Sequence, residues 1–269
     1  MAVKINIPTI NGLTLKTKGK YVADDIFMNV DIPKYDGSVT GEAQSINPMK
    51  TLLDGRQEAK YLFQNYTGTS VEDVISYSDT ENVTNMNYMF SGCSNLLTIP
   101  QLNTSNVTEM LGIFEGCTDL QTIPSLDISN VTRTYRMFYN CQDLQSIPQL
   151  NTSNVTDIGW MFYWCRSLKI IDITSMDKIT STSNTQYLCQ RCYSLTKFII
   201  RNMTVIPPLD TNSFNECYHF NGTINATYNP EGLKSGRIYV PDDKVEELKQ
   251  ATNWSAYADI IVPLSTLEE

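Results

Sequence analysis

A spacing of 24 residues between successive cysteines constrains the fold of this chain more than any other feature. Cys93, Cys117, Cys141 and Cys165 follow one another at this interval. Further columns keep the same register: Phe90, Phe114, Phe138 and Phe162; Leu96, Leu120, Leu144 and Leu168; Ile99, Ile123, Ile147 and Ile171; and the Val-Thr pairs at 83, 107, 131 and 155. A fixed period of this length is the signature of a repeat protein, whose copies bury their apolar faces by stacking on their neighbours.

The copies that flank these four are less regular. Cys192 follows at a step of 27 residues and Cys217 at a step of 25, with Phe214 again three residues before the cysteine. Upstream, Phe63 lies in a stretch that resembles a degenerate first copy. We therefore predict a solenoid over about residues 56–225, with atypical end copies acting as caps.

Each copy is predicted to hold one short helix and one short strand. Thr108 is placed to begin the helix by accepting hydrogen bonds from amides two or three residues on. Met110, Ile113 and Phe114 then share one apolar face of that helix. The positions suited to a left-handed residue at the helix end are Gly92, Gly116 and Asn140. The Leu-x-x-Ile-Pro segments, which end at Pro100, Pro124 and Pro148, are predicted strands. The predicted fold class is an α/β solenoid with a repeat of about 24 residues.

The repeat sequence resembles a known family. The pattern Ile-Pro-x-Leu-x-Thr-Ser-Asn-Val-Thr, followed by Met-Phe-x-x-Cys-x-x-Leu, resembles the BspA-type leucine-rich repeats of bacterial surface proteins. Residues 149–156, Gln-Leu-Asn-Thr-Ser-Asn-Val-Thr, are a near-consensus instance. The resemblance implies the leucine-rich-repeat fold; such repeats serve several binding roles.

The two ends of the chain differ from the repeats in their sequence pattern. Residues 1–35 alternate apolar and polar positions between turn signals and are predicted to form a small β-module for docking. Residues 36–55 form a predicted linker, rich in Gly and Ser. Residues 226–269 form a predicted C-terminal cap, with a strand at 237–241 and a short helix capped by Asp242.

Both ends also resemble modules of phage proteins. The C-terminal segment Ile238-Tyr239-Val240-Pro241-Asp242 and the opening Val30-Asp31-Ile32-Pro33 are similar to flanking modules in tail and structural proteins of phages that infect Firmicutes-like hosts. The N-terminus lacks the apolar core of a signal peptide, so we expect the chain to be made in a cytoplasm. This resemblance implies a virion protein, which assembles inside the host cell.

Charge and composition argue against several classes of function. The formal net charge is −9 and no stretch clusters Lys and Arg, so nucleic-acid binding is not expected. No apolar run is long enough to insert into a membrane. His219 is the single histidine, and Gly-rich phosphate loops are absent, so we expect no enzyme and no cofactor.

The cysteines also allow a metal-binding or redox interpretation. Cys189 and Cys192 form a Cys-x-x-Cys pair that is typical of half a zinc site or of a redox pair. The repeat register accounts for both residues, because Cys192 fills the cysteine column and Cys189 fills the phenylalanine column. We therefore predict no metal site and free, buried thiols that act as small apolar side chains.

Two surfaces are candidates for contact with a ligand or partner. The aromatic residues that crowd the third and fourth copies are Tyr135, Tyr139, Trp160, Tyr163 and Trp164. Tyr139 and Tyr163 lie one period apart, so a solenoid would stack them on one exposed ridge. Such a ridge is typical of glycan or protein binding, and the alternative is ordinary packing or contact with another copy of the chain. Gln101 and Gln149, which follow the strand prolines, belong to the second surface.

These observations predict a non-enzymatic phage virion protein on the tail or another external appendage. Its partners would be other virion proteins and a glycan or protein of the host surface. The first alternative is a bacterial cell-surface or secreted adhesin, and the second is an intracellular protein-binding scaffold. A homo-oligomer is left open, because no coiled-coil heptad indicates an oligomeric state.

Overall fold

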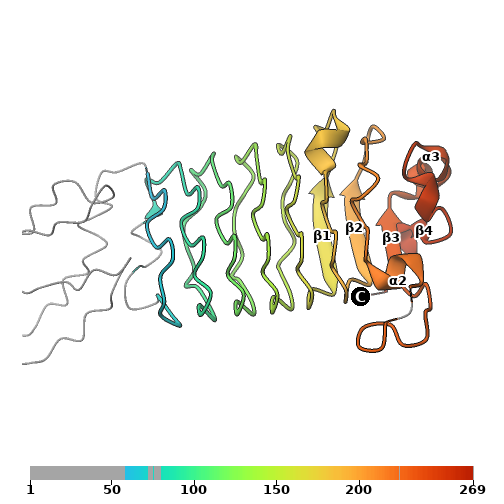
Figure 1. The fold of residues 1–269 in the computed structure, drawn as a ribbon. Helices are drawn as coiled ribbons and strands as arrows, with labels where there is room; N and C mark the ends of the chain where they lie inside the picture. Colours follow the sequence, from blue (N-terminus) through green and yellow to red (C-terminus); the bar gives the residue numbers. More distant parts are fainter. Residues whose placement is uncertain (1–57, 72–74, 76–79, 224, 269) are drawn as a thin grey trace, which may run out of the picture.

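The structure, a computed structural model, describes residues 58–71, 75, 80–223 and 225–268, which include a small parallel sheet and a few short helices (Figure 1). The N-terminal β-module predicted at 1–35 and the linker at 36–55 lie outside the described residues. The strands are β1 (Ile170–Ser175), β2 (Lys197–Asn202), β3 (Arg237–Val240) and β4 (Ile261–Pro263). The helices are α2 (Tyr218–Asn221), α3 (Val245–Gln250) and the 3₁₀ turns η2 (Thr182–Thr185), η3 (Asp242–Lys244), η4 (Ser255–Tyr257) and η5 (Leu264–Thr266).

The four strands form one parallel sheet in the order β1-β2-β3-β4. Ile171 pairs with Phe198, Phe198 with Ile238, and Ile238 with Ile261. These side chains are buried and form one row across all four strands. Together with the few helices, this sheet is compatible with an α/β repeat fold.

The copies that precede the sheet lie side by side, from the blue to the yellow-green part of Figure 1. Parallel bridges join one position in each copy to the same position in the next: Glu58, Asn85, Glu109, Arg133 and Asp157. The sequence spacing between these bridged positions is that of the repeat. Residues one period apart therefore become neighbours in space.

The short helix predicted in each of the central copies is wrong. The segment around Phe114 is a run of turns, as are its equivalents in the copies on either side. Left-handed residues interrupt it twice, at Gly112 (φ 53°) and Gly116 (φ 76°). The other central copies repeat this pair at Tyr88 and Gly92, Arg136 and Asn140, and Trp160 and Trp164. A right-handed helix cannot continue through such residues, and the left-handed positions expected at a helix end instead shape a turn.

Hydrogen bonds between copies explain why the turns replace a helix. The Phe90 amide donates to the carbonyl oxygen of Ile113 in the next copy (2.9 Å), whereas the Ser91 amide donates back to Tyr88 (3.1 Å). Along the turn, successive amides therefore alternate between a carbonyl oxygen of the next copy and a carbonyl oxygen of their own copy. The helical pattern would satisfy the same groups within one copy and leave the neighbours unjoined.

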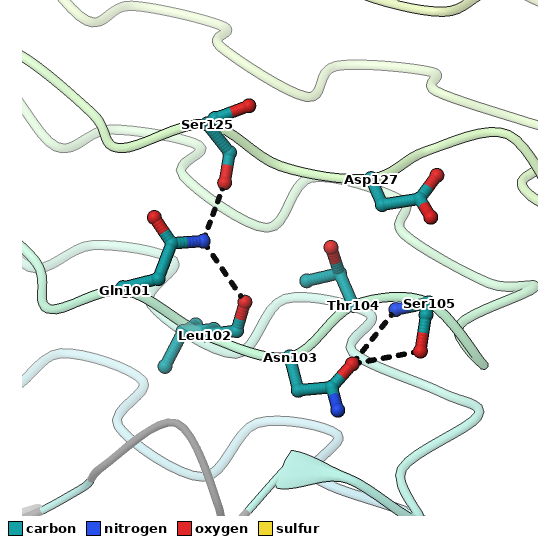
Figure 2. Close-up of a pocket in the computed structure, with 7 residues that line it drawn as sticks. All are labelled: Gln101, Leu102, Asn103, Thr104, Ser105, Ser125 and Asp127. Atoms are coloured by element: carbon teal, nitrogen blue, oxygen red, sulfur yellow. Dashed lines mark hydrogen bonds between the residues drawn. The ribbon is translucent and has the colours of Figure 1, made fainter.

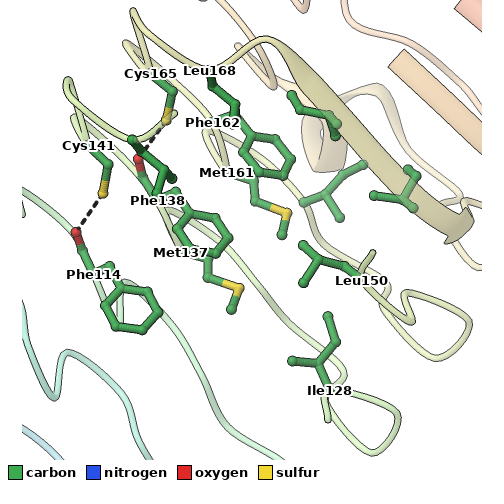
Figure 3. Close-up of a cluster of buried hydrophobic side chains, with 14 of the residues drawn as sticks. Phe114, Ile128, Met137, Phe138, Cys141, Leu150, Met161, Phe162, Cys165 and Leu168 are labelled. Carbon is green, nitrogen blue, oxygen red and sulfur yellow. Dashed lines mark hydrogen bonds between the residues drawn. The ribbon is translucent and has the colours of Figure 1, made fainter. Parts of the chain in front are cut away.

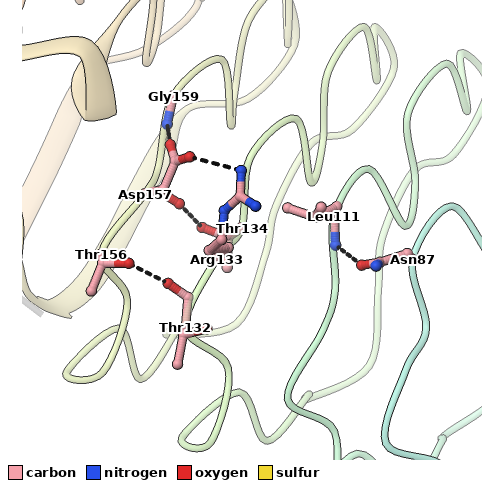
Figure 4. Close-up of polar contacts among 8 residues, drawn as sticks. All are labelled: Asn87, Leu111, Thr132, Arg133, Thr134, Thr156, Asp157 and Gly159. Carbon is pink, nitrogen blue, oxygen red and sulfur yellow. Dashed lines mark hydrogen bonds and ion pairs between the residues drawn. The ribbon is translucent and has the colours of Figure 1, made fainter.

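Side chains add further hydrogen bonds between copies (Figure 4). The Thr156 hydroxyl donates to the Thr132 carbonyl oxygen at 3.0 Å, and the Leu111 amide donates to the Asn87 side-chain oxygen at 2.6 Å. Thr108 behaves like Thr156: its hydroxyl donates to the Thr84 carbonyl oxygen at 3.3 Å. The predicted role of Thr108 as a helix cap is therefore wrong, because its hydroxyl links two copies.

The Leu-x-x-Ile-Pro segments predicted as strands do not form regular strands. Copies that carry Pro100, Pro124 and Pro148 form no regular strand, although Thr122 and Ser146 share an isolated bridge. In β1 the equivalent position is Asp172, which is not a proline and pairs with Ile199 of β2. Proline has no N–H to donate to a ladder, so the continuous sheet begins where the proline column ends.

Stacked phenylalanine rings run through the core (Figure 3). Phe114 and Phe138 have ring centroids 5.6 Å apart, and Phe138 and Phe162 repeat this distance. These rings, like those of Phe63 and Phe90, are fully or almost fully buried, as are all seven cysteines. The cysteines are free thiols. The predicted repeat core of Phe90, Cys93, Phe114, Cys117, Phe138, Cys141, Phe162, Cys165, Cys192, Phe214 and Cys217 is thus buried at every position.

The C-terminal segment packs against the last copies. The strand predicted at 237–241 is present as β3, and the predicted helix is present as α3. Trp254 is fully buried, and its indole N–H donates to the Pro207 carbonyl oxygen at 2.8 Å. Asp242 does not cap α3 with its side chain, because its carboxylate accepts from the Ser265 amide at 3.0 Å. It therefore joins η3 to η5. In the part of the chain that the structure describes, no helix is long and apolar enough to cross a lipid bilayer.

Candidate functional site

The aromatic residues singled out from the sequence gather on one side of the turns, together with three arginines and a further tyrosine. We call this set the aromatic surface; it comprises Tyr135, Arg136, Tyr139, Trp160, Tyr163, Trp164, Arg166, Tyr187 and Arg191. All nine are partly exposed. Arg136, Trp160 and Tyr187 occupy the same column of the repeat, two residues before the phenylalanine column, and all three have positive φ.

Most rings of the aromatic surface contact one another, and one pair is stacked. Tyr139 and Tyr163 have centroids 5.0 Å apart and planes inclined by 8°, as expected for residues one period apart. Trp160 lies 4.9 Å from Tyr163 and 4.3 Å from Tyr187. Tyr139 and Tyr163 therefore each cover one face of the other, whereas the Trp160 ring is tilted against both of its neighbours.

Arg136 lies at the centre of the surface. Its guanidinium carbon is 5.3 Å from the Tyr135 ring centroid, 5.1 Å from Tyr139 and 5.6 Å from Trp160. It also pairs with Glu115 at 3.4 Å. Burial raises the pKa of the Glu115 carboxyl above its ordinary value, and the charge of Arg136 opposes that rise. Burial, followed by the neighbouring Tyr163, also raises the pKa of Tyr139, so this phenol keeps its proton at neutral pH.

A second cationic group surrounds Trp164. The guanidinium carbon of Arg191 lies 5.6 Å from the Trp164 ring centroid, and that of Arg166 lies 5.9 Å from it. Arg191 also pairs with Glu216 at 3.0 Å. Arg166 has no ion pair with any carboxylate among residues 58–71, 75, 80–223 and 225–268. Arg166 is thus the cation of this surface whose charge is not neutralised by the described carboxylates.

Two buried donors on the surface lack an acceptor. The Nε of Arg136 and the Nε1 of Trp164 are buried nitrogen atoms with no hydrogen-bond partner among the described residues. A buried donor without a partner costs about 1–3 kcal/mol. Because both atoms are buried, neither is accessible to a ligand unless the side chains that cover it move.

The polar surface predicted from the sequence contains a shallow pocket (Figure 2). Its volume is about 210 Å³, and it is lined by Gln101, Leu102, Asn103, Thr104, Ser105, Ser125 and Asp127. The Gln101 side-chain amide closes one side by donating to the Ser125 carbonyl oxygen (2.6 Å). The buried Thr104 hydroxyl has no partner among the described residues. Gln149 is exposed and does not line this pocket, so the structure does not join the two predicted glutamines in one site.

The Cys-x-x-Cys pair fits the repeat register. Cys192 donates from its thiol to the Phe162 carbonyl oxygen at 3.0 Å, as the other column cysteines do to the preceding copy. Burial raises the pKa of the Cys189 thiol well above its ordinary value. Among the described residues, no group of three or more His, Cys, Asp and Glu side chains is placed to hold a metal ion.

Sequence reasoning missed Arg136, Arg166, Tyr187 and Arg191 as members of the aromatic surface. The repeat register contained the signal for two of them, because Arg136, Trp160 and Tyr187 share one column. The column also holds Tyr88 and Gly112, so its residues are chemically mixed and give no uniform signal in the sequence.

Residues 57–176 match the family model described as "Mycoplasma protein of unknown function, DUF285". This match is consistent with a BspA-type repeat protein. It covers the central copies and all of β1 and includes all five residues of the predicted aromatic set. No curated protein and no solved structure matches the chain.

Proposed function

We propose that this chain is a leucine-rich-repeat solenoid that serves as a non-enzymatic structural protein of a phage virion. It would lie on the tail or another external appendage and present one side of its repeats to host-cell or virion proteins. The aromatic surface carries this proposal. It places Tyr, Trp and Arg, the residue types enriched in protein interfaces, at partly exposed positions on consecutive copies.

The solenoid part of the proposal is supported by the bonds between copies. Amides of one copy donate to carbonyl oxygens of the next, for instance Phe114 to Met137 (3.0 Å) and Phe138 to Met161 (2.9 Å). The same relationship recurs around Phe63, Phe90 and Phe162. Each copy therefore depends on its neighbours, which is the defining property of a solenoid.

The virion context is supported by the resemblance of the two chain ends to phage modules.

The non-enzymatic part of the proposal is supported by the surroundings of the single histidine. The Nδ1 of His219 lies 2.8 Å from the Ser235 hydroxyl, and burial lowers the pKa of the ring. Ser235 is exposed, and none of the ion pairs among the described residues includes His219, so this contact lacks the acidic group that orients the base in a catalytic triad.

A bacterial cell-surface or secreted adhesin is the second candidate. The match of residues 57–176 to a family named after a bacterium favours it, as does the resemblance to BspA-type repeats. The same aromatic surface would then meet a partner on another cell or in the surrounding matrix.

Immunogold labelling tests the proposal. An antibody raised against the chain is applied to purified particles and to envelopes of producing cells, with particles lacking the gene as a control. Label at a fixed place on the particles is the expected result, and that place separates a tail appendage from the capsid. Label on envelopes with none on particles would replace the virion proposal by the adhesin.

A further inference from the structure

We propose that the polar pocket between two neighbouring copies binds a single neutral hexose ring through its hydroxyl groups. The walls of this pocket include Gln101, Asn103, Ser125 and Asp127 (Figure 2). The inference names a class of ligand for the proposed function and rests on that function only for the source of the sugar, a glycan of the host surface. It uses none of the residues of the aromatic surface.

A hydrogen bond that recurs elsewhere in the repeats is missing at the corner that holds the pocket. The Thr80 hydroxyl accepts from the amide of Asn103 in the next copy at 2.8 Å, and the Thr152 hydroxyl accepts in the same way at 3.0 Å. The equivalent bond would join the Asp127 amide to Thr104. The Thr104 hydroxyl, however, has no partner among the described residues. The two copies are therefore not joined at this point, and the pocket lies there.

Two further bonds between the same copies are missing close by. The Thr108 hydroxyl donates to the Thr84 carbonyl oxygen at 3.3 Å, and the Thr156 hydroxyl donates to the Thr132 carbonyl oxygen at 3.0 Å. The amides of Thr108 and Thr156 donate to the same oxygens, each at 2.8 Å. Thr132, which also lies within the described residues, makes neither bond to the Thr108 carbonyl oxygen. Elsewhere the two copies stay joined by backbone hydrogen bonds, so the opening is local.

The sequence departs from the repeat at the same corner. Residues 102–105 and 150–153 are Leu-Asn-Thr-Ser, whereas residues 126–129 of the copy between them are Leu-Asp-Ile-Ser. Asp127 thus replaces a neutral amide by a carboxylate. Hydrogen bonds from Ser129 lower the pKa of Asp127, so this carboxyl is ionised at neutral pH. Because Asp127 is exposed, its charge is open to a ligand in the pocket.

The groups that line the pocket both donate and accept hydrogen bonds. Ser105 and Ser125 contribute hydroxyl groups, Gln101 an amide and Asp127 a carboxylate, and all four residues are exposed. The Thr104 hydroxyl is buried, so the ligand is held by these exposed groups. A ligand hydroxyl donates to a carboxylate and accepts from a serine with the same oxygen, whereas an ammonium ion only donates. The carboxylate repels anions, so a neutral polyol fits the lining best.

The size of the pocket limits the ligand to one sugar ring. The volume of about 210 Å³ would hold about seven water molecules at about 30 Å³ each. Pockets for drug-sized ligands are larger, at about 300–1,000 Å³. None of the seven residues that line the pocket is aromatic, so binding depends on hydrogen bonds rather than on stacking. We therefore expect a dissociation constant on the order of 1 mM for a free monosaccharide.

Saturation-transfer difference NMR on the full chain is the test, with glucose, galactose, mannose and N-acetylglucosamine offered one at a time. Transfer to at least one of these sugars is the expected result. Ser125→Tyr places a ring in the pocket and should weaken binding of that sugar by about tenfold or more, the loss of one or two hydrogen bonds. The matched control is Gln149→Tyr, because Gln149 is the exposed residue one period after Ser125 and does not line the pocket. It should bind as the wild type does.

The charge of Asp127 has a test of its own. Glucuronate has the ring of glucose with a carboxylate added, and it should bind the wild type more weakly than glucose does. Asp127→Asn removes the charge at nearly constant size and should reduce this difference. Circular dichroism of each variant establishes that it is folded.

Three outcomes would overturn the proposal: no transfer to any of the four sugars, as in a pocket that holds only water; equal binding by the wild type and Ser125→Tyr; and tighter binding of glucuronate than of glucose. Because immunogold labelling locates the protein and NMR measures its ligand, each can fail without the other. Sugar binding by a protein that labels only cell envelopes would keep this site and remove the virion.

Discussion

The thiol of Cys141 donates a hydrogen bond to the carbonyl oxygen of Phe114 in the preceding copy, with 3.1 Å between sulfur and oxygen. The same oxygen also accepts from the amide of Cys117 in its own copy, again at 3.1 Å. Each column cysteine therefore joins two copies through a carbonyl that already closes a turn. This arrangement explains why the column holds a small residue with a donor.

Replacing Cys141 should separate the packing contribution from the hydrogen bond. Cys141→Ala removes a fully buried sulfur and the donor, so we expect a loss of about 1–3 kcal/mol in the free energy of unfolding. Cys141→Ser keeps a donor in a similar volume and should lose less than the alanine variant. Urea unfolding followed by circular dichroism measures both. Equal losses in the two variants would show that the thiol acts through volume alone.

The buried thiols should make the protein less stable in alkaline solution. Burial raises the pKa of Cys117, Cys165 and Cys217 well above the ordinary value of 9.0. The unfolded chain therefore loses these protons at a lower pH than the folded chain does. Their contribution to stability is full below pH 9.0 and declines as the pH rises above it. The melting temperature, measured from neutral to alkaline pH, should fall above this value.

Thiol labelling supplies the control for this prediction. In the folded protein a thiol reagent should react slowly even at alkaline pH, and in denaturant it should modify all seven cysteines. Rapid labelling of the native protein would contradict the burial on which the pH argument depends.

The phenylalanine column should be the least tolerant part of the core. Phe138→Ala removes a ring that stacks at 5.6 Å on both Phe114 and Phe162, and we expect a loss of about 3–5 kcal/mol. Phe138→Leu retains much of the volume and should lose less. Thermal unfolding of the two variants measures the difference. Similar melting temperatures for wild type and Phe138→Ala would mean that the ring stack adds little to stability.

The columns of the core could be predicted because they depend on one simple rule, that residues a period apart become neighbours. The positions of Phe138, Cys141 and Leu144 follow from that rule and are buried. The stacking of Tyr139 on Tyr163 follows from it as well. A fixed period determines adjacency in space without any knowledge of the local backbone.

The conformation within each copy could not be predicted in the same way. Tyr88, Arg136 and Trp160 have positive φ, although side chains of this size rarely adopt such angles. Hydrogen bonds to the next copy outweigh this local preference, and an isolated stretch of sequence does not contain them. The i, i+3, i+4 spacing of apolar residues therefore indicated a helix where the chain forms turns.

Two glycines should differ in their tolerance of a side chain. Gly116→Ala introduces a residue at φ 76°, but its new methyl group would meet only backbone atoms of Gly92, at 3.6 Å or more. We expect a loss of about 1 kcal/mol from the left-handed angle alone. Gly112→Ala has φ 53° and would also place the methyl group 2.5 Å from Cε1 of Tyr88, so it should lose more. Thermal unfolding of the two alanine variants tests this order, and a reversed order would contradict it.

The aromatic surface should contribute to stability as well as to binding. Replacing Tyr139, Tyr163 and Trp164 together by alanine removes one stacked ring pair and three contacts between guanidinium groups and rings. Each such contact contributes about 0.5–1.5 kcal/mol, so the triple variant should melt at a clearly lower temperature. Arg166→Gln removes only one of these contacts, with Trp164, and should therefore lower the melting temperature much less than the triple variant does. A triple variant with unchanged melting temperature would show that these rings serve binding alone, and only then could loss of binding in that variant be assigned directly to its side chains.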